Sequence, residues 1–458
     1  MHTKRMCQTA ALLGLLSFWG YAAGTTWYVD GGVSSSGDGT TWESAFKKIQ
    51  EGIDAAESGD EVIVAQGTYI ENIQFRGKNI VLGSTDPLDP NMVANTIIDG
   101  DQAGSVVIFS GTENETCVLS GFTIRNGIGE ELPYERAGGG ICGGTWENRT
   151  HATIQNNVIT GNSADEGGGL AYCHGTVQQN TVTGNSVTGN GGGLLYCDGV
   201  IQNNVITANS IIRTGPFPPG YGYGGGLNLC YGTIQNNVIA GNSAGEVGGG
   251  LANCGVRILN NTVVGNRARY GGGLNTSVRD EVIRNCIIWG NTAEEKGDQI
   301  YGSNTPSFSC IQDWSGGGER NISGDPRFVD PGGGIYRLSL DSPCIDAGQN
   351  EAWMSDAVDL DGNPRIFYGR SSLTVDMGAY EYGSFHFKIV GVVQAADGGV
   401  DLRWGSRPDV VYMVWSCHDL LTATWEKEIA IVSSETTASW TDTAAVGRMK
   451  FYRVEMKQ

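Results

Sequence analysis

Acidic and aromatic side chains gather in the loops that come just before a repeated glycine triplet. One loop carries Asp165 and Glu166, and another carries Glu246. Glycoside hydrolysis uses two carboxyl groups, one as a general acid and the other as a base or nucleophile. Aromatic side chains present flat apolar faces on which a sugar ring can stack. The aromatic candidates for carbohydrate binding are Tyr134, Phe217, Tyr221, Tyr223 and Tyr270.

The spacing of the carboxylates limits the chemistry that they could share. Asp165 and Glu246 occupy the same place in repeat units three steps apart, which is about 14 Å at a strand spacing of about 4.8 Å. Glycoside hydrolases hold their two carboxyl groups about 5 to 9.5 Å apart. Asp165 and Glu166 are the alternative pair, although adjacent residues are poorly placed to flank one bond. Ion pairs between loops, of Asp165 with Arg136 and of Glu246 with Arg269, are the other interpretation of these charges.

These loops recur because the chain is built from repeats. Gly-Gly-Gly begins at residues 138, 167, 191, 224, 248 and 271, in steps of 23 to 33 residues. A period in this range signals a solenoid. Between the triplets run segments such as TIQNNVITGN at 153, whose short β-branched runs broken by Asn and Gly predict strands and tight turns. We therefore predict an all-β fold, a right-handed parallel β-helix with rungs of about 24 residues, in which equivalent residues stack in columns.

The columns predict what fills the interior and the turns. Leu170 begins one apolar column and Ile154 another. Two Asn columns are predicted to be turn ladders, in which Asn adopts left-handed φ and its amide bonds to neighbouring rungs. The glycine triplet is predicted to mark a corner that needs positive φ or close backbone approach. The Asn columns are Asn157, Asn180, Asn204, Asn237 and Asn261, and residues 162, 185, 209, 242, 266 and 291.

A cysteine column runs through the same repeats, at Cys173, Cys197, Cys230 and Cys254. Ligands of one zinc ion lie within about 4.6 Å of each other. Three rungs separate the first and last cysteines by about 14 Å, so the column cannot converge on one ion. Two interpretations stay open: a stack of buried reduced thiols, or disulfides between neighbouring rungs.

The N-terminus is typical of a secretory signal. Residues 1–24 combine a basic start with an apolar run and small residues, so the mature chain is expected to begin near Thr25. No later stretch has the roughly 20 apolar residues of a transmembrane segment, which predicts a secreted, soluble chain. Loss of Lys4 and Arg5 leaves 27 basic against 49 acidic residues, a formal charge of −22. That charge argues against nucleic acid as a partner.

The pattern changes on both sides of the regular repeats, which run from about 138 to 291. Apolar residues on one helical face predict a capping helix at about 42–57, over the N-terminal end of a β-helix that spans 25–320. Residues 321–383 lose the period, and residues 385–458 alternate like the short antiparallel strands of a small β-sandwich. Asp359, Asp361 and Asn363 in DLDGNP are spaced like the start of a calcium loop, and a hydrogen-bonded turn is the alternative.

Two resemblances follow from these motifs. Residues 159–162 (ITGN) and 167–170 (GGGL) resemble the two motifs of the polymorphic outer-membrane-protein repeat, with Ile in place of Phe and Gly in place of Ala. SPCIDAG and DLDGNPR…VDMGAYEY are similar to the choice-of-anchor Q domain at the end of bacterial surface β-helix proteins. The second resemblance implies a disulfide between Cys310 and Cys344. Arg213, in RTGP, fits the Arg-x-x-Pro pattern of some pectate lyases.

Taken together, these patterns predict a secreted or outer-membrane-surface protein that binds or adheres to an extracellular polysaccharide or a cell surface. The alternative is a polysaccharide lyase or glycoside hydrolase of the pectate-lyase-like β-helix type. Its groove would lie beside loops 127–137 and 210–223. A third possibility is a structural spacer that presents the C-terminal module. No cofactor other than the possible calcium ion is predicted.

Overall fold

The structure is a computed structural model that describes residues 24–133, 135–212, 222–276, 281–366, 372–382, 389–394, 399–405, 411–418, 425–432, 437–443 and 450–457. The chain divides into two compact units, residues 1–360 with 365–382, and residues 361–364 with 383–458. Almost all of the expected signal segment lies outside the described residues. No helix within them combines the length and the apolar character needed to cross a membrane.

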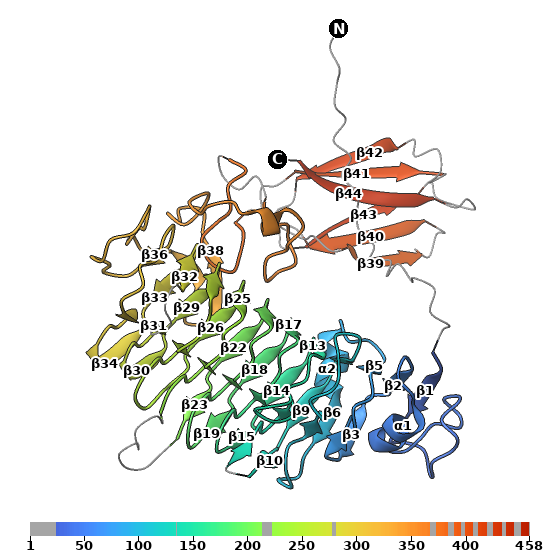
Figure 1. The fold of residues 1–458 in the computed structure, drawn as a ribbon. Coiled ribbons are helices and arrows are strands. Elements are labelled where there is room, and N and C mark those ends of the chain that lie inside the picture. The colour runs from blue at the N-terminus through green and yellow to red at the C-terminus, as the bar shows by residue number, and fades with distance from the viewer. Residues whose placement is uncertain are drawn as a thin grey trace. The chain divides into compact units, whose positions relative to one another are not determined.

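The first unit is a right-handed parallel β-helix, as predicted, in which three long parallel sheets stack rung upon rung (Figure 1). Sheet A contains β1 (Thr26–Val29), β2 (Glu61–Val64), β5 (Val81–Ser84), β8 (Val118–Ser120), β13 (Thr153–Gln155), β17 (Thr176–Gln178), β21 (Val200–Gln202), β25 (Thr233–Gln235), β28 (Arg257–Leu259) and β32 (Val282–Arg284). Sheet B contains β3 (Gly67–Ile70), β6 (Thr96–Asp99), β9 (Thr123–Arg125), β14 (Val158–Thr160), β18 (Thr181–Thr183), β22 (Val205–Thr207), β26 (Val238–Ala240), β29 (Thr262–Val264), β33 (Ile287–Trp289) and β36 (Cys310–Ile311). Sheet C contains β4 (Ile73–Gln74), β7 (Val107–Ile108), β12 (Ile141–Cys142), β16 (Leu170–Ala171), β20 (Leu194–Leu195), β24 (Leu227–Asn228), β27 (Leu251–Ala252), β31 (Leu274–Thr276) and β35 (Ile300–Gly302).

Shorter elements decorate this solenoid. They are the helices α1 (Ile49–Ala55), α2 (Pro90–Asn95) and η1 (Ala352–Ser355), the pairs β10 (Glu130–Glu131) with β11 (Arg136–Ala137), β30 (Arg267–Tyr270) with β34 (Thr292–Lys296), and β37 (Phe328–Asp330) with β38 (Ile335–Leu338), and the triplet β15 (Ser163–Ala164), β19 (Ser186–Val187) and β23 (Ser210–Ile211).

The second unit contains two antiparallel three-stranded sheets, consistent with the predicted β-sandwich. One holds β39 (Ile389–Gln394), β40 (Val400–Gly405) and β43 (Thr437–Asp442), and the other β41 (Val411–Cys417), β42 (Glu426–Val432) and β44 (Phe451–Lys457). Leu402, Trp404, Tyr412 and Val414 are the centre of its own hydrophobic core.

Two ladders of buried Asn side chains fix the register of the rungs. In the first ladder Asn180 Nδ2 donates to Asn204 Oδ1 at 3.1 Å and to the carbonyl of Ile154 at 2.8 Å. The backbone N–H of Asn180 donates to the same Asn204 Oδ1 at 3.0 Å. Each amide therefore bonds to both neighbouring rungs. The second ladder, which includes residues 162, 185 and 209, repeats this pattern.

The predicted backbone conformation of these Asn residues was wrong. Left-handed φ occurs one residue earlier, as at Asn156 (56°) before Asn157 and at Asn203 (55°) before Asn204. The bend at the left-handed residue turns the following side chain into the interior, where its amide can reach the neighbouring rungs. The second Asn column follows the same rule, with glycine in the left-handed position at five of its six rungs.

Each member of the glycine triplet meets a separate steric demand. The first, such as Gly167, has a φ of 61°. A Cβ on the second, Gly168, would lie 2.6 Å from the carbonyl oxygen of Gly192 on the next rung. A Cβ on the third, Gly169, would lie 2.6 Å from the carbonyl oxygen of Gly193. Close packing of three corner backbones therefore accounts for the triplet.

The N-terminal helix is shorter than the predicted 42–57. Helix α1 begins at Ile49, because residues just before it add to sheet A: Phe46 forms a parallel bridge with Val29. The Glu71 carboxylate accepts the backbone N–H groups of Ile49 and Gln50 and so caps the helix. Ile49 and Ile53 are fully buried in the solenoid core, so the helix covers its N-terminal end.

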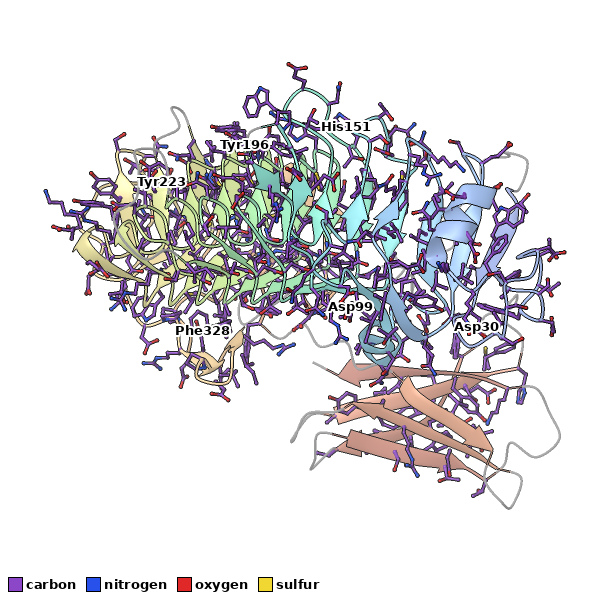
Figure 2. The ribbon with its side chains drawn as sticks, turned by 90° about the horizontal axis from the view of Figure 1, so that it is seen from below. Asp30, Asp99, His151, Tyr196, Tyr223 and Phe328 are labelled. Carbon is purple, nitrogen blue, oxygen red and sulfur yellow. The ribbon has the colours of Figure 1, made fainter. Side chains whose placement is uncertain are left out.

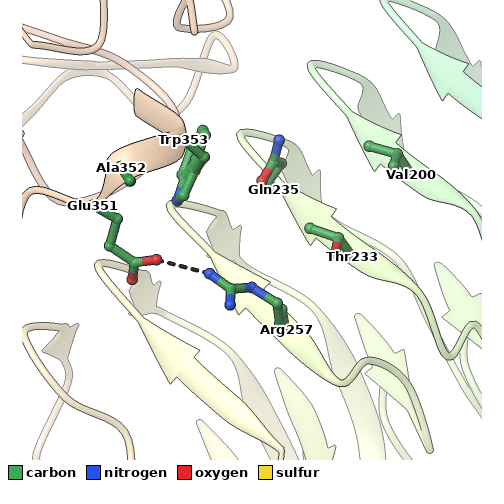
Figure 3. A pocket seen from close by; sticks show the side chains of 7 residues that line it. All are labelled: Val200, Thr233, Gln235, Arg257, Glu351, Ala352 and Trp353. Atoms are coloured by element: carbon green, nitrogen blue, oxygen red, sulfur yellow. Dashed lines mark hydrogen bonds and ion pairs between the residues drawn. The ribbon is translucent and has the colours of Figure 1, made fainter. Parts of the chain in front are cut away.

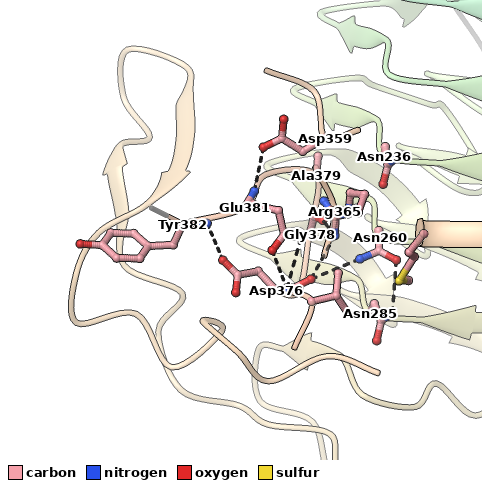
Figure 4. A network of polar contacts seen from close by, with 12 residues as sticks. Asn236, Asn260, Asn285, Asp359, Arg365, Asp376, Gly378, Ala379, Glu381 and Tyr382 are labelled. Carbon is pink, nitrogen blue, oxygen red and sulfur yellow. Dashed lines mark hydrogen bonds and ion pairs between the residues drawn. The ribbon is translucent and has the colours of Figure 1, made fainter. Parts of the chain in front are cut away.

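The segment that follows the solenoid returns along its corner between sheets A and B. Left-handed Asn residues hold it there: Asn236 Nδ2 donates to the carbonyl of Val358 at 3.0 Å, and Asn260 Nδ2 to that of Asp376 at 3.2 Å. We call residues 344–360, 365–366 and 372–382 the returning segment. Its centre is Arg365, which is fully buried, pairs with Glu381 at 3.0 Å and donates to two carbonyl groups (Figure 4).

Every cysteine that the structure describes is a buried free thiol. In the predicted column each sulfur donates to the carbonyl two residues earlier, as Cys173 Sγ does to Ala171 at 3.4 Å. Cys310 and Cys344 are also free but share one hydrophobic cluster. The adjacent Cys310 thiol and burial raise the pKa of Cys344 well above its usual value. The disulfide between them is not formed in this structure and stays a prediction for oxidising conditions.

We expect Asn204→Ala to lower the free energy of unfolding by about 2 to 4 kcal/mol, because it leaves buried N–H and C=O groups on both neighbouring rungs without partners. Urea denaturation followed by circular dichroism measures the change. Gln202→Ala, in a half-buried surface ladder two residues away, is the matched control and should cost less than 1 kcal/mol. Equal losses in the two variants would contradict this role for the Asn ladder.

Candidate functional site

A cluster of aromatic and charged residues covers the outer face of sheet C at β16 and β20. Its members come from three places: the rungs themselves, the loop after β10, and the loop between β12 and β13. Figure 2 shows Tyr196 on the same edge of the solenoid as His151 and Tyr223, with Phe328 and Asp99 on the opposite edge. We call this set the sheet C cluster: Glu135, Trp146, Arg149, Glu166, Tyr172, His174, Tyr196 and Asp198.

Two stacked tyrosines form the base of the sheet C cluster. Tyr172 and Tyr196 occupy the same position on consecutive rungs, with ring centroids 5.7 Å apart and planes 8° from parallel. Both have left-handed φ, 61° and 50°, and the equivalent Leu229 and Asn253 do as well. That conformation costs a bulky residue about 1 to 3 kcal/mol, and it favours Asn. The corner would accept Asn at lower cost. The half-buried Tyr196 is therefore a candidate for a role in binding, and Tyr172, which is only 3% exposed, supports it from below.

Trp146 and Arg149 extend the aromatic surface outward. The Trp146 ring lies edge-on to Tyr196, with the ring centroids 4.7 Å apart, and the residue is 57% exposed. The Arg149 guanidinium lies 4.3 Å from the Trp146 centroid and 5.5 Å from that of Tyr196. An exposed indole that other side chains hold in place is a stacking surface for a sugar ring.

The charge of Arg149 is balanced inside the sheet C cluster. Its Nη1 atom lies 2.9 Å from Asp198 Oδ2, with both side chains mostly buried. His174 occupies the position equivalent to Asp198 on the preceding rung, and its imidazole contacts both Arg149 and Asp198. Burial lowers the pKa of His174 more than the neighbouring Asp198 raises it, so the imidazole is neutral at pH 7. This part of the sheet C cluster therefore presents hydrogen-bonding groups rather than a net charge.

Glu166 is the most perturbed acid of the sheet C cluster. Only 6% of the residue is exposed, and its carboxyl oxygens accept the backbone and side-chain N–H groups of Asn190 at 3.0 and 3.2 Å. Burial, the nearby Glu135 carboxylate and, more weakly, Asp165 raise the pKa of Glu166 to about 8. Glu166 is therefore protonated at neutral pH. Glu135 accepts the Tyr172 hydroxyl group, and burial together with this hydrogen bond raises the pKa of Tyr172 well above its usual value.

The structure separates the other acids that the sequence singled out. Asp165 is exposed, and its Oδ2 accepts the backbone N–H of Arg136 at 3.1 Å, so the two residues interact through the backbone. Glu246 forms the predicted ion pair with Arg269, at 3.3 Å. Backbone bonds through residues 189 and 222 link Asp165 to Glu246 in three steps, which places them in one column as the sequence predicted.

The structure places the predicted aromatic residues in different surroundings. The backbone N–H of Tyr223 donates to Asn190 Oδ1, the same Asn that binds Glu166, which brings Tyr223 next to the sheet C cluster. Tyr270 lies elsewhere, with its ring 5.3 Å from that of Tyr301 and beneath Arg269. Tyr134, Phe217 and Tyr221, like Arg213, lie outside the described residues.

Most of the sheet C cluster was missed by sequence reasoning, although part of its signal was present. Tyr172 and Tyr196 match in GGGLAYCHG and GGGLLYCDG, and so do His174 and Asp198. An in-register pair on the outer face of a rung could have marked all four. Trp146 and Arg149 come from an insertion with no counterpart in the other repeats, so no periodicity could place them.

The described residues contain no group of three or more His, Cys, Asp or Glu side chains that could hold a metal ion. Asp359 is fully buried, and its Oδ2 accepts the backbone N–H of Glu381 at 2.9 Å. Calcium at Asp359, Asp361 and Asn363 stays a prediction.

Comparison with known proteins identifies no family. No protein-family model matches the chain, and no curated protein matches its sequence. Among solved structures, the crystal structure of pectate lyase Pel9A aligns with 78% of this chain and 96% of its own, at 16% sequence identity and a TM-score of 0.44. A likeness of this size carries no argument about activity, and the fold assignment depends on the three stacked sheets.

We expect the Glu166→Gln substitution to change how stability depends on pH. Because the folded-state pKa of Glu166 lies above its unfolded value of 4.5, its contribution to stability is fully present below pH 4.5 and is lost as the pH rises through 8. Relative to the variant, the wild type should lose up to about 5 kcal/mol of unfolding free energy between pH 4.5 and 9. Urea titrations at several pH values measure the difference.

Glu281 offers an internal check on that comparison. Burial raises its pKa to about 8 as well, but it titrates in both proteins and cancels in the difference. Parallel pH curves for wild type and Glu166→Gln would show that Glu166 is already ionised at neutral pH.

Proposed function

We propose that this chain is a secreted or cell-surface β-helix protein that binds an extracellular polysaccharide through the sheet C cluster. The observation that carries the proposal is the exposed Trp146 indole, held by Arg149 over a stacked pair of tyrosines. A rigid aromatic surface surrounded by hydrogen-bonding groups suits a sugar ring, whose C–H face is apolar and whose hydroxyl groups both donate and accept.

Two features support a neutral polysaccharide rather than a strongly acidic one. Arg149 is already paired with Asp198, so it brings no free positive charge to the surface. The chain as a whole carries a formal charge of −20, which repels a polyanion. Export, and attachment to an outer membrane or cell surface, are part of this proposal; they follow from the N-terminal signal pattern and the two resemblances.

The binding proposal predicts that Tyr196→Asn lowers affinity at least tenfold, the equivalent of about 1.4 kcal/mol. Asn suits the left-handed backbone at this position, as Asn253 shows two rungs later, so the variant should fold. Leu229→Asn is the matched control, because it makes the same replacement in the same column without removing an aromatic ring. Binding of the mature protein to an array of polysaccharides, followed by calorimetry on those that bind, measures the effect. Equal affinity in wild type and Tyr196→Asn would refute the proposed surface.

Hydrolysis of the bound polysaccharide is the second candidate function, and the protonated Glu166 beside Glu135 favours it. A carboxyl group that keeps its proton at neutral pH can act as a general acid, while a neighbouring carboxylate takes the opposite role. This arrangement would use a pair that the sequence did not suggest, since Glu135 comes from the loop before β11 and Glu166 from the loop before β16.

If the protein is a hydrolase, Glu166→Gln should reduce release of reducing sugar by at least a hundredfold, and the wild-type rate should fall above pH 8. Glu246→Gln, which breaks only the ion pair with Arg269, should keep the wild-type rate. Binding without release of reducing ends or unsaturated ends by the wild type would leave the protein as a binding protein and remove the enzymatic candidate.

A further inference from the structure

A pocket lies on the outer face of sheet A, away from the sheet C cluster. Its volume is about 560 Å³, within the range of sites that hold a small ligand. One wall is sheet A and the other is the returning segment, where η1 stands over the strands (Figure 3). The residues around it are Val200, Thr233, Gln235, Arg257, Glu351 and Trp353, with Ala352 between the last two.

The sheet A wall carries a ladder of Gln side chains. Gln178 Nε2 donates to Gln155 Oε1, Gln202 Nε2 to Gln178 Oε1, and Gln235 Nε2 to Gln202 Oε1, each at 2.8 Å. Every amide thus points in the same direction along the solenoid. The ladder ends at the pocket, because Leu259 follows Gln235 in the column. Among the described residues of the ladder, only Gln235 Oε1 accepts no hydrogen bond from a Gln amide of the next rung.

Ion pairs fix the opposite wall in place. Glu351 Oε2 lies 2.7 Å from Arg257 Nη2, and Glu351 Oε1 lies 3.0 Å from Arg284 Nη1. Both carboxylate oxygens are therefore occupied, and Glu351 is anchored to two consecutive rungs of sheet A. The charges at this end of the pocket are engaged with each other, so none of them requires a charged ligand.

Trp353 leaves one donor without a partner. Its Nε1 atom is buried, and no hydrogen-bond acceptor in the described residues reaches it. A buried N–H without a partner costs about 1 to 3 kcal/mol, and such groups are rare in native structures. The pocket therefore offers an indole ring and the open acceptor Gln235 Oε1, while the Trp353 N–H itself is enclosed by protein.

We propose that this pocket binds one pyranose ring of a neutral glycan. A hydroxyl group can donate to Gln235 Oε1 while the apolar face of the sugar ring covers the Trp353 indole. A carboxylate can only accept, so it could not pair with Gln235 Oε1. The ion-paired Glu351, Arg257 and Arg284 leave no charge that calls for a charged ligand. This site is separate from the sheet C cluster and does not depend on the function proposed there.

Calorimetry with cellohexaose, xylohexaose and mannohexaose, and with an oligogalacturonate hexamer as the acidic counterpart, tests the pocket on the full-length mature protein. At least one neutral hexasaccharide should bind, and Trp353→Ala should weaken that binding at least tenfold. Trp353→Phe keeps an aromatic ring of smaller area, so it should retain part of the affinity. Gln235→Leu should also weaken binding. Because Gln235 lies on sheet A and not on η1, a loss of affinity in this variant cannot result from misfolding of η1.

The Tyr196→Asn variant separates this site from the sheet C cluster. Loss of a binding event in Trp353→Ala and Gln235→Leu that Tyr196→Asn retains supports the pocket. Binding that responds to Tyr196→Asn alone, tighter binding of the galacturonate hexamer than of every neutral one, or no binding of any neutral hexasaccharide at millimolar concentration would each overturn it.

Discussion

Buried side-chain amides, stacked at the spacing of the rungs, are the interaction on which this structure depends. Each Asn Oδ1 accepts both the backbone N–H and the side-chain Nδ2 of the preceding rung, as Asn204 does from Asn180. A shift of one residue between rungs would leave these buried groups without partners and would reverse every side chain. The ladders therefore hold the solenoid in one register. That register also stacks the Leu and Ile columns on one another in the core.

Fixed register turns the outer surface into columns of similar residues. Tyr172 and Tyr196 stack because equivalent positions on consecutive rungs must lie side by side. The same constraint builds the Gln ladder of sheet A and places His174 against Asp198. Arrays of this kind suit a ligand that is itself a linear repeat, which is why the proposed ligands on two different faces are both glycans. The solenoid supplies repetition, and single residues from outside the repeat complete each site.

The left-handed turn residues have a second role beyond bending the chain. Asn236 and Asn260 place their amides on the outer corner, where they bind carbonyl groups of the returning segment. A buried ion pair between Arg365 and Glu381 then holds that segment together from within. Sheet A and the segment enclose the pocket at Trp353, while sheet B and Tyr336 with Tyr380 enclose a smaller one of about 350 Å³. The turn residues and the ion pairs of Glu351 thus together hold the returning segment where it forms a wall of the sheet A pocket.

The sequence alone determined the parallel β-helix, its interior columns, the Asn ladders and the ion pair of Glu246 with Arg269, because all of these follow from a regular period. It also placed Glu166 among the candidate acids. Only the tertiary structure decided that Glu166 is buried beside Glu135, that Trp146 and Arg149 cross over the tyrosine column, and that Glu351 and Trp353 return to sheet A. Each of these contacts joins a repeat to an insertion or to the chain after the repeats. Periodicity positions residues relative to their own column, and it carries no information about where an aperiodic segment will pack.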